Sequence, residues 1–262
     1  MTILEQKLNE IKARKRIGLM THVVIGYPSL EETIQLVKTM AENGADIVEL
    51  QIPFSDPLAD GPTIMKACEA SLKSGTRVKD AFVVMKKLSQ SVSIPLLFMG
   101  YYNTVLHYGV EKFCKDAERS GAAGLIFPDM PIDEENQEYF FRNCKQYNLH
   151  TIQIISPVST DIRLQKNTKV ANGFVYCTAR QGVTGAKENL SQELASYLKR
   201  VKKYFHIPIA VGFGISKKEY IQALTGYADI AVIGSKIIDI INRSAKNDIY
   251  TNVKTFLQTL QT

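Results

Sequence analysis

Carboxylate side chains gather in one short stretch of the sequence, and they are the first candidates for chemistry. Glu49 lies inside the apolar run 47–52, and a carboxylate there is costly to bury unless it is used or paired. Side chains alternate along a strand, so Ile47, Glu49 and Gln51 share one face. If that face points into a closed sheet, Glu49 becomes a general acid or base that works near neutral pH. The alternative is a structural carboxylate paired with a buried Arg or Lys.

Two further carboxylates follow in the loop after this run. Asp56 precedes Pro57 and Asp60 precedes Gly61 within the segment 54–62. Loops on a rigid scaffold commonly carry binding and catalytic residues. Because Asp-Pro and Asp-Gly are also turn dipeptides, turn formation or helix capping is the alternative role for both side chains.

Glycine-containing turns near the end of the sequence indicate an anion site. Gly212–Gly214 follows one apolar run and Gly234-Ser235 follows the next, each before a helical segment. Free amides at helix starts bind phosphate, and the loops after strands seven and eight form the usual phosphate site of eight-stranded α/β barrels. The two turns therefore predict a phosphorylated substrate. Residues 179–186 are typical of a loop that closes over a site, or of an ordinary strand-to-helix connection.

Eight short apolar runs, separated by amphipathic segments, must position these residues. Each run has the length of a strand, and most are continuous, as expected for parallel strands buried on both faces. Pro208 falls inside the seventh run, so that strand is expected to begin near Ile209. The runs are 19–25, 47–52, 95–99, 124–127, 151–155, 173–177, 207–211 and 230–233.

The repeated order of strand, helix, glycine and strand predicts an α/β fold. We expect a single (β/α)8 TIM barrel over residues 1–262, with an extra N-terminal helix in residues 1–16 that caps its base. A doubly wound open sheet is the alternative. In the first unit, Ser29 and Glu32 have the spacing of a capping box, and Gly44 is suited to end the helix because it can adopt a positive φ.

Composition narrows the class of protein. The chain is 45% apolar and 22% charged, which is ordinary for a globular protein. The net charge of +6 comes from scattered Lys and Arg; the densest group, residues 12–16, suits the dipole at a helix end better than a nucleic-acid patch. Its four cysteines form no CxxC pair and its four histidines show no metal spacing. No signal peptide or membrane-length apolar run stands out, so we expect a cytoplasmic protein without nucleic-acid or membrane partners.

Four segments resemble one enzyme family. Glu49–Pro62, with the sequence ELQIPFSDPLADGP, closely resembles the signature of tryptophan synthase α subunits, and the segment is long and chemically unusual. Residues 180–185 look like the closing loop of that family, and Gly212–Ser216 together with Gly234-Ser235 look like its phosphate site. The motifs cover a small part of the chain, whereas the expected architecture matches over its whole length.

The resemblance implies a retro-aldol cleavage of indole-3-glycerol phosphate to indole and glyceraldehyde 3-phosphate, in tryptophan biosynthesis. Glu49 would deliver a proton to indole C3 and remove one from the glycerol hydroxyl. Asp60 would accept the indole N–H and stabilise the positive charge that develops on the ring. Thr184 would hold Asp60 when the loop closes, and Tyr176 matches a site tyrosine near the glycerol chain.

The resemblance also implies the residues that bind the substrate. Phe213 would line the pocket, and Tyr101 matches a family residue on the third strand. His22 stands where a residue that lines the indole pocket is expected. The phosphate would be held by Gly185, Gly214, Gly234 and Ser235.

A protein partner follows from the same resemblance. In the family, Asp56 and its loop, which begins at Pro53, face a β subunit that carries pyridoxal phosphate and receives indole through a tunnel. An α2β2 heterotetramer is implied, and this chain is expected to need no cofactor and no metal of its own. Two alternatives stay open: a lyase that releases indole without a β subunit, and a chain that mainly binds and activates one.

Four positions depart from the family pattern. Gln51 stands where the family usually has Gly, and its amide is placed to bind the Glu49 carboxylate or to crowd the substrate. His22 is an unusual residue for the indole pocket, and a satisfied, packed histidine is a simpler interpretation than a catalytic one. Gly100 and Thr104 are less usual on the third strand. These changes leave the catalytic pair intact and are expected to alter the shape of the pocket.

Overall fold

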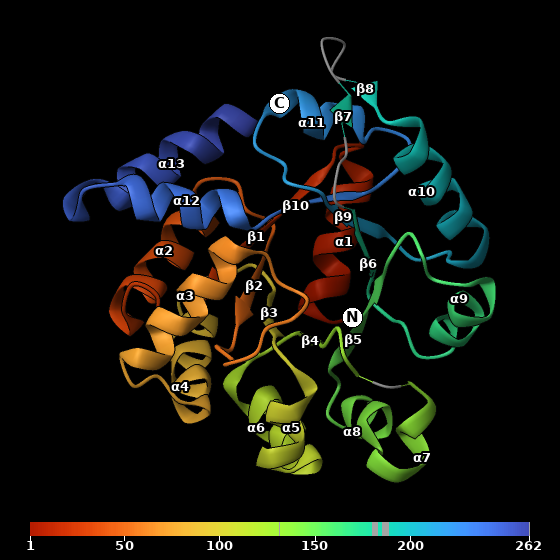
Figure 1. Cartoon of the computed structure of the whole chain (residues 1–262), viewed down its shortest axis with the longest axis horizontal. Helices are drawn as coiled ribbons and strands as arrows, with labels where there is room; N and C mark the ends of the chain where they lie inside the picture. Colours follow the sequence, from red (N-terminus) through yellow and green to blue (C-terminus); the bar gives the residue numbers. More distant parts are fainter. Residues whose placement is uncertain (131, 180–182, 185–188, 262) are drawn as a thin grey trace.

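A closed barrel of eight parallel strands forms the centre of the chain, with helices around it (Figure 1). The computed structural model describes residues 1–130, 132–179, 183–184 and 189–261. Around the ring the strands follow the order β1-β2-β3-β4-β5-β6-β9-β10, and β10 pairs with β1 to close it. The predicted (β/α)8 barrel is confirmed, and the open-sheet alternative is wrong.

All eight predicted apolar runs form barrel strands, with bounds that differ by at most two residues. The seventh strand begins at Ile209, as expected from Pro208, which has no N–H to donate. Two short strands, β7 (Val183–Thr184) and β8 (Asn189–Leu190), pair antiparallel outside the barrel. The barrel strands are β1 (Gly18–Val24), β2 (Ile47–Gln51), β3 (Leu96–Met99), β4 (Gly124–Ile126), β5 (His150–Ile155), β6 (Val175–Thr178), β9 (Ile209–Gly212) and β10 (Ile230–Ile233).

Helices occupy the connections between the strands, so that consecutive strands run parallel. Short 3-10 turns, η1 (Ile132–Glu134) and η3 (Lys246–Asp248), precede α7 and α13. The helices are α1 (Ile3–Ala13), α2 (Leu30–Glu42), α3 (Pro62–Lys73), α4 (Val78–Ser89), α5 (Tyr102–Tyr108), α6 (Val110–Ser120), α7 (Glu135–Glu138), α8 (Phe140–Gln146), α9 (Asp161–Thr168), α10 (Gln192–Tyr204), α11 (Lys218–Ala223), α12 (Ser235–Arg243) and α13 (Ile249–Leu260).

The ends of α2 show how local sequence sets these helices. Ser29 accepts a hydrogen bond from the Glu32 amide, as a helix cap should, with 3.2 Å between the atoms. The Glu32 carboxylate instead lies 4.0 Å from the ammonium of Lys246, so only half of the predicted capping box forms. Gly44 follows the C-cap residue Asn43 and has a φ of +100°, as predicted for the end of this helix.

Apolar side chains pack on both sides of the barrel wall because neighbouring residues of a strand face opposite ways. On β2, Ile47 belongs to the cluster inside the barrel, whereas Val48 and Leu50 belong to the cluster between the strands and the helices. Met20 on β1 lies in the inner cluster with Ile47. The face that carries Ile47 therefore points inward, and the later residues of the same face reach the far end of the barrel.

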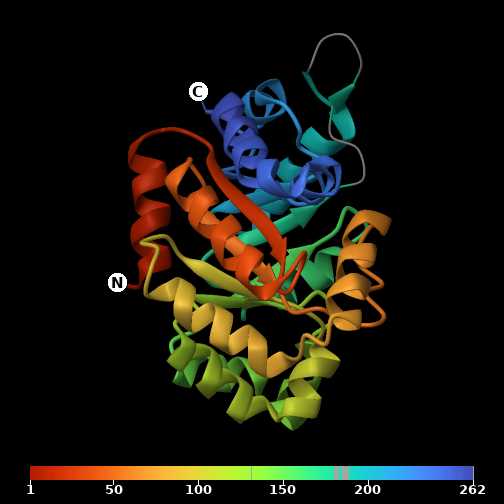
Figure 2. The same ribbon diagram turned by 90° about the vertical axis from the view of Figure 1, so that its left-hand side faces the viewer.

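Helix α1 closes the end of the barrel at which the strands begin (Figure 2). Leu4, Leu8 and Ile11 are buried in the inner cluster, so the helix supplies the floor of the barrel core. Thr2 and Glu5 exchange two hydrogen bonds in a capping box that fixes where the helix starts. The predicted basal helix is confirmed.

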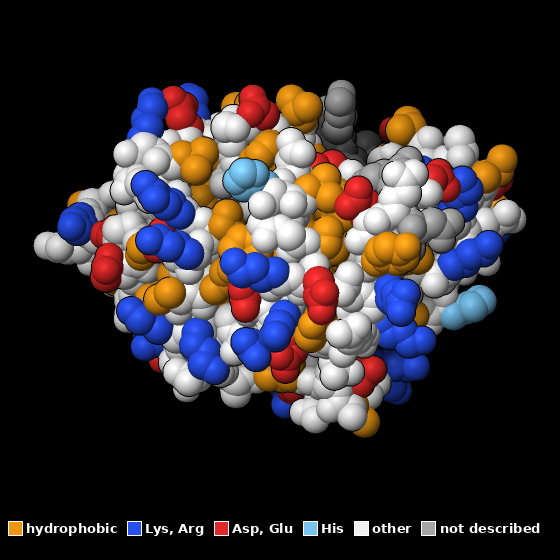
Figure 3. All heavy atoms as spheres, turned by 90° about the horizontal axis from the view of Figure 1, so that it is seen from below, with side chains coloured by type: hydrophobic (Ala, Val, Ile, Leu, Met, Phe, Trp, Pro, Cys, Tyr) orange, Lys and Arg blue, Asp and Glu red, His pale blue; other side chains and the backbone are white. Residues whose placement is uncertain are grey.

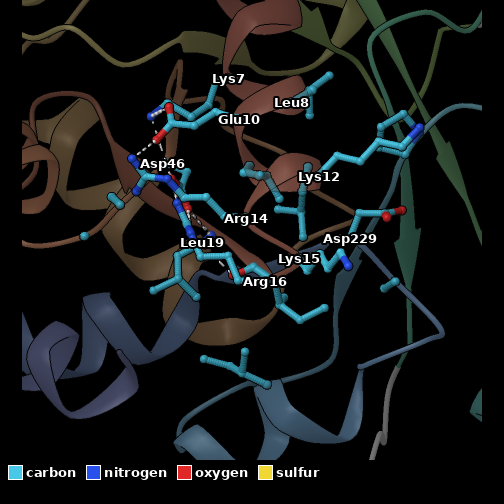
Figure 4. Close-up of a pocket in the computed structure, with 18 of the residues that line it drawn as sticks. Lys7, Leu8, Glu10, Lys12, Arg14, Lys15, Arg16, Leu19, Asp46 and Asp229 are labelled. Atoms are coloured by element: carbon cyan, nitrogen blue, oxygen red, sulfur yellow. Dashed lines mark hydrogen bonds and ion pairs between the residues drawn. The ribbon is translucent and has the colours of Figure 1, made fainter. Parts of the chain in front are cut away.

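Two residues of the basic segment 12–16, at the end of α1, form ion pairs at the base of the barrel. Arg16 donates two hydrogen bonds of 2.6 Å to Asp46, which also accepts one from the Leu19 amide. This pairing raises the pKa of the Arg16 guanidinium above its usual value. Arg14 pairs with Glu10 at 2.9 Å. Figure 4 shows these side chains around a basal cavity of about 790 Å³.

Charged side chains of both signs lie on the surface seen from below in Figure 3, where Lys and Arg outnumber Asp and Glu. Over the described ranges, no helix has the length and apolar character needed to cross a membrane.

Replacing Asp46 with Ala should destabilise the fold, because Arg16 would keep a partly buried charge without its partner. We expect a loss of about 2 kcal/mol in the free energy of unfolding and a melting temperature lower by roughly 5 °C. Thermal unfolding followed by circular dichroism measures the change. Glu69→Ala is the control, because its 2.6 Å pair with Lys73 is mostly exposed and should leave the melting temperature unchanged. Equal melting temperatures for both variants would contradict the assigned role of Asp46.

Candidate active site

The inward face of β1 and β2 changes from apolar to polar toward the carboxyl ends of the strands. His22 and Glu49 are register partners on the two strands, and each is only 1% exposed. The Nδ1 atom of His22 lies 3.0 Å from Oε1 of Glu49. The partner of the buried carboxylate is therefore a histidine rather than the Arg or Lys considered from the sequence.

Asp60 is held near the end of β2 by two side chains. Gln51 is fully buried, and its Nε2 donates a hydrogen bond of 2.6 Å to Oδ2 of Asp60. The hydroxyl of Tyr101 donates to the same oxygen at 3.0 Å and accepts from the Ala59 amide at 2.9 Å. Burial and the charge of Asp60 raise the pKa of Tyr101, so its hydroxyl stays a donor. The amide of Gln51 thus binds Asp60, and its predicted bond to Glu49 is replaced by this one.

Three buried polar atoms at this place have no hydrogen-bond partner among the described residues. They are Nε2 of His22, Oε2 of Glu49 and Oε1 of Gln51. A buried polar atom without a partner costs about 1–3 kcal/mol, and native proteins keep few of them. Three such atoms on the inward face of two adjacent strands make this place a candidate for contact with a ligand.

Tyr176 lies on β6, across the barrel from β2, and is close enough to Glu49 and Asp60 to feel their charges. A Cβ atom on Gly212 would lie 3.0 Å from its hydroxyl oxygen, so the glycine leaves room for the ring. Burial and the negative charges of Glu49 and Asp60 raise the pKa of Tyr176 well above its usual value. The hydroxyl therefore remains protonated and can donate a hydrogen bond.

Cys177, the next residue, plays no part in this group. Burial raises the pKa of its thiol to about 12, against a lowering contribution from the hydrogen bond with Tyr197. Because a thiol reacts through its thiolate, this side chain is inert near neutral pH. Across the described residues, no set of three or more His, Cys, Asp or Glu side chains is placed to hold a metal ion.

The predicted phosphate turns lie at the ends of β9 and β10, the seventh and eighth strands of the barrel. Gly214 has a φ of +78°, and a Cβ there would meet nothing within 4 Å. Phe213 is buried, and α11 begins four residues after Gly214 rather than directly after the turn. Helix α12 begins at Ser235, directly after Gly234, as predicted.

Two predicted residues belong to the connection after β6. Thr184 lies in strand β7, and its side chain is outside the described part of the chain. Gly185 is also outside the described residues. The structure therefore adds nothing to the roles that the sequence assigns to these two positions.

The loop after β2 extends from the site to the surface. Pro53 is buried, whereas Asp56 and Leu58 are exposed, Leu58 by 90%. Phe54 stacks on Tyr101, with 5.2 Å between the ring centres. A cavity of about 600 Å³ opens beside the loop, and its walls are Phe54, Asp56, Leu58, Ala59, Tyr101, Asn103, Pro128 and Asp129.

The two unusual residues expected on the third strand lie after it, because β3 ends at Met99. Gly100 is buried, and a Cβ there would lie 3.2 Å from the ring of Phe127, so a larger side chain needs the ring to move. Thr104 lies in the first turn of α5, and its amide donates a hydrogen bond to the carbonyl of Tyr101.

The contact between Gly212 and Tyr176 was not predicted from the sequence. The signal for it was a glycine at the end of a strand, where another group often approaches closely.

Comparison with known proteins identifies the family. A family model described as tryptophan synthase alpha chain matches residues 8–262. The chain belongs to the tryptophan synthase alpha chain family. The alpha chain of Desulfotalea psychrophila is 45% identical over 241 residues, which are 92% of this chain and 94% of that protein. The alpha chain of Desulforapulum autotrophicum is 41% identical over 258 residues, covering 98% of this chain and 100% of that one.

Solved structures agree with this assignment to the tryptophan synthase alpha chain family. Tryptophan synthase subunit alpha from Legionella pneumophila superposes with a TM-score of 0.89 at 28% identity, covering 99% of this chain and 97% of that one. A chain of tryptophan synthase from M. tuberculosis in an open form gives 0.88 at 30% identity, covering 98% and 96%. Family membership makes the chain a lyase that acts on indole-3-glycerol phosphate in tryptophan biosynthesis.

Tyr101→Phe should lower the rate of cleavage without unfolding the chain, because it removes one of the two donors that hold Asp60. We expect kcat/KM to fall about tenfold, the size of one hydrogen bond to a charged group. Steady-state indole formation measures the effect. Tyr108→Phe is the matched control, since it removes a 2.7 Å bond to Asp116 on the outside of the barrel. An unchanged kcat/KM in Tyr101→Phe would show that Asp60 needs no support from this side.

Proposed function

We propose that the chain cleaves indole-3-glycerol phosphate with Glu49 as the proton-transfer group and Asp60 as the residue that stabilises charge on the indole ring. The observation that carries the proposal is the buried Oε2 of Glu49, which has no partner in the described chain and sits in the same group of side chains as Asp60. A carboxyl oxygen left free in this way is suited to exchange a proton with a substrate.

The chemistry follows from two proton movements. A proton from Glu49 adds to indole C3, which places positive charge on the ring nitrogen, and Asp60 accepts the N–H and stabilises that charge. Removal of the proton from the adjacent glycerol hydroxyl turns that carbon into an aldehyde. The electrons of the broken carbon–carbon bond return to the ring, so indole and glyceraldehyde 3-phosphate form and Glu49 recovers its proton.

Other residues of the site bind the rest of the substrate. The protonated hydroxyl of Tyr176 is available to the glycerol chain, and Phe213 lines the pocket. The turns at Gly214 and Gly234-Ser235 would hold the phosphate through backbone amides, with Ser235 at the start of α12. Tyr101 and His22 would line the part of the pocket that holds the indole ring. Tyr101 acts there through its hydrogen bond to Asp60.

We infer that the loop after β2 docks on a β subunit. Its exposed Asp56 and Leu58 present a charged and an apolar side chain to solvent, while the buried Pro53 fixes the base of the loop. An α2β2 complex in the cytoplasm, with pyridoxal phosphate in the β subunit and no cofactor in this chain, fits the family. Asp56 and Leu58 of this loop, together with Tyr101, are among the residues that line the cavity beside it.

Glu49→Gln keeps the size of the side chain and removes its capacity to carry a proton. We expect kcat for indole release to fall by about a thousandfold, within the range of general acid–base catalysis, with an unchanged melting temperature. Glu42→Gln, at the exposed end of α2, is the control and should be fully active. Substantial activity in a folded Glu49→Gln sample would exclude Glu49 as the proton-transfer group.

Addition of a purified β subunit should raise the rate of indole formation, because docking is expected to order the loop that carries Asp60. Asp56→Lys should weaken the complex about tenfold by reversing a charge at the rim of the interface. Titration of the rate with the β subunit measures both effects. Equal rates with and without the β subunit would favour a self-sufficient lyase, and a tight complex without turnover would favour a chain that only activates its partner.

A further inference from the structure

We propose that His22 is a positioning residue that fixes the orientation of Glu49, an inference that rests on the function proposed above. The two side chains come from adjacent strands whose backbones are paired in register, so neither end of the contact lies on a loop. Nδ1 of His22 is 3.0 Å from Oε1 of Glu49. Both residues are buried, and the contact is therefore shielded from competing water.

The contact engages only one oxygen of the carboxyl group. With the ring proton on Nδ1, His22 donates to Oε1 of Glu49, whereas Oε2 is buried without a partner in the described chain. A carboxyl group held by one oxygen can still exchange a proton through the other. His22 thereby defines Oε2 as the reacting oxygen of Glu49 and limits rotation of the group about its final bond.

The same hydrogen bond survives the proton transfers of the reaction. Oε1 of Glu49 keeps a lone pair for the Nδ1–H of His22 whether Oε2 carries a proton or not. The orientation of the acid is therefore the same before and after it gives its proton away. Reactive groups that are held in place in advance need no rearrangement during the chemical step, which favours catalysis.

The surroundings of His22 differ from those of a histidine that serves packing alone. Its Nε2 is buried and has no partner among the described residues, so only one of its two ring nitrogens is satisfied. A Cβ atom on Gly234 would lie 3.6 Å from the Cβ of His22, which places the histidine beside the turn after β10. The ring is thus confined between β2 and the predicted phosphate turn.

Two amide variants separate positioning from packing. His22→Asn can place its amide nitrogen near the position of Nδ1, whereas His22→Gln reaches toward the position of Nε2. Both are neutral and polar, so a residue that serves packing alone would respond to them in a similar way. If His22 positions Glu49, we expect Asn to retain kcat within about threefold and Gln to lose at least about tenfold, the size of a charge-assisted hydrogen bond, with KM changed by less than about threefold.

The measurement is steady-state indole formation from indole-3-glycerol phosphate with a saturating β subunit. Wild type and Glu49→Gln are run beside the two variants, so that failure of the two proposals can be told apart. An inactive wild type, or an active Glu49→Gln, would refute the proposed function itself. An active wild type with an inactive Glu49→Gln, but equal kcat in the Asn and Gln variants, would overturn only the role of His22.

A second measurement keeps the proposal testable if a variant does not fold. In folded wild-type chain labelled with 15N-histidine, the His22 signals should show a proton on Nδ1. The other three histidines of the chain are replaced one at a time to assign the spectrum. A His22 ring with its only proton on Nε2 would overturn the proposal, because Nδ1 would then have no hydrogen to donate to Glu49.

Discussion

Side chains of a closed parallel barrel must alternate between its interior and its helix layer, and the position of every site residue on a strand depends on this alternation. The inward face of β2 begins with Ile47 in the apolar core and continues with Glu49 and Gln51. On β1 the same face carries Met20 and then His22. A register slip of one residue would send the carboxylate into the helix layer. The same inward face of each strand therefore supplies core residues near its start and candidate active-site residues near its end.

This arrangement concentrates unfavourable interactions at one end of the molecule. Buried polar atoms on His22, Glu49 and Gln51 lack partners among the described residues and oppose folding. Interactions at the opposite end of the barrel stabilise the fold. Helix α1 adds its apolar face to the inner core, and the Arg16–Asp46 pair links the residues that precede β1 and β2. Stability and reactivity are thus separated along the barrel axis, as is common in this architecture.

Much of the fold could be predicted from the sequence, because strand length, apolar runs and the break at Pro208 are local signals. The contacts of the site could not. The bond from Gln51 to Asp60 depends on the path of a loop, and the pairing of His22 with Glu49 depends on the register between two strands 27 positions apart in sequence. At Ser29 the local pattern predicted one hydrogen bond that does not form. The Glu32 carboxylate, expected to accept from the Ser29 amide, lies instead near Lys246, which is far away in the sequence.

The basal helix has a consequence for the movement of molecules through the protein. Leu4, Leu8 and Ile11 pack the base of the barrel core with apolar side chains, so a phosphorylated molecule does not pass through that end. Glyceraldehyde 3-phosphate therefore leaves by the end at which the substrate entered. The loop after β2, which carries Asp60, lies at that end, so binding and release both involve the loop that also carries a residue of the reaction.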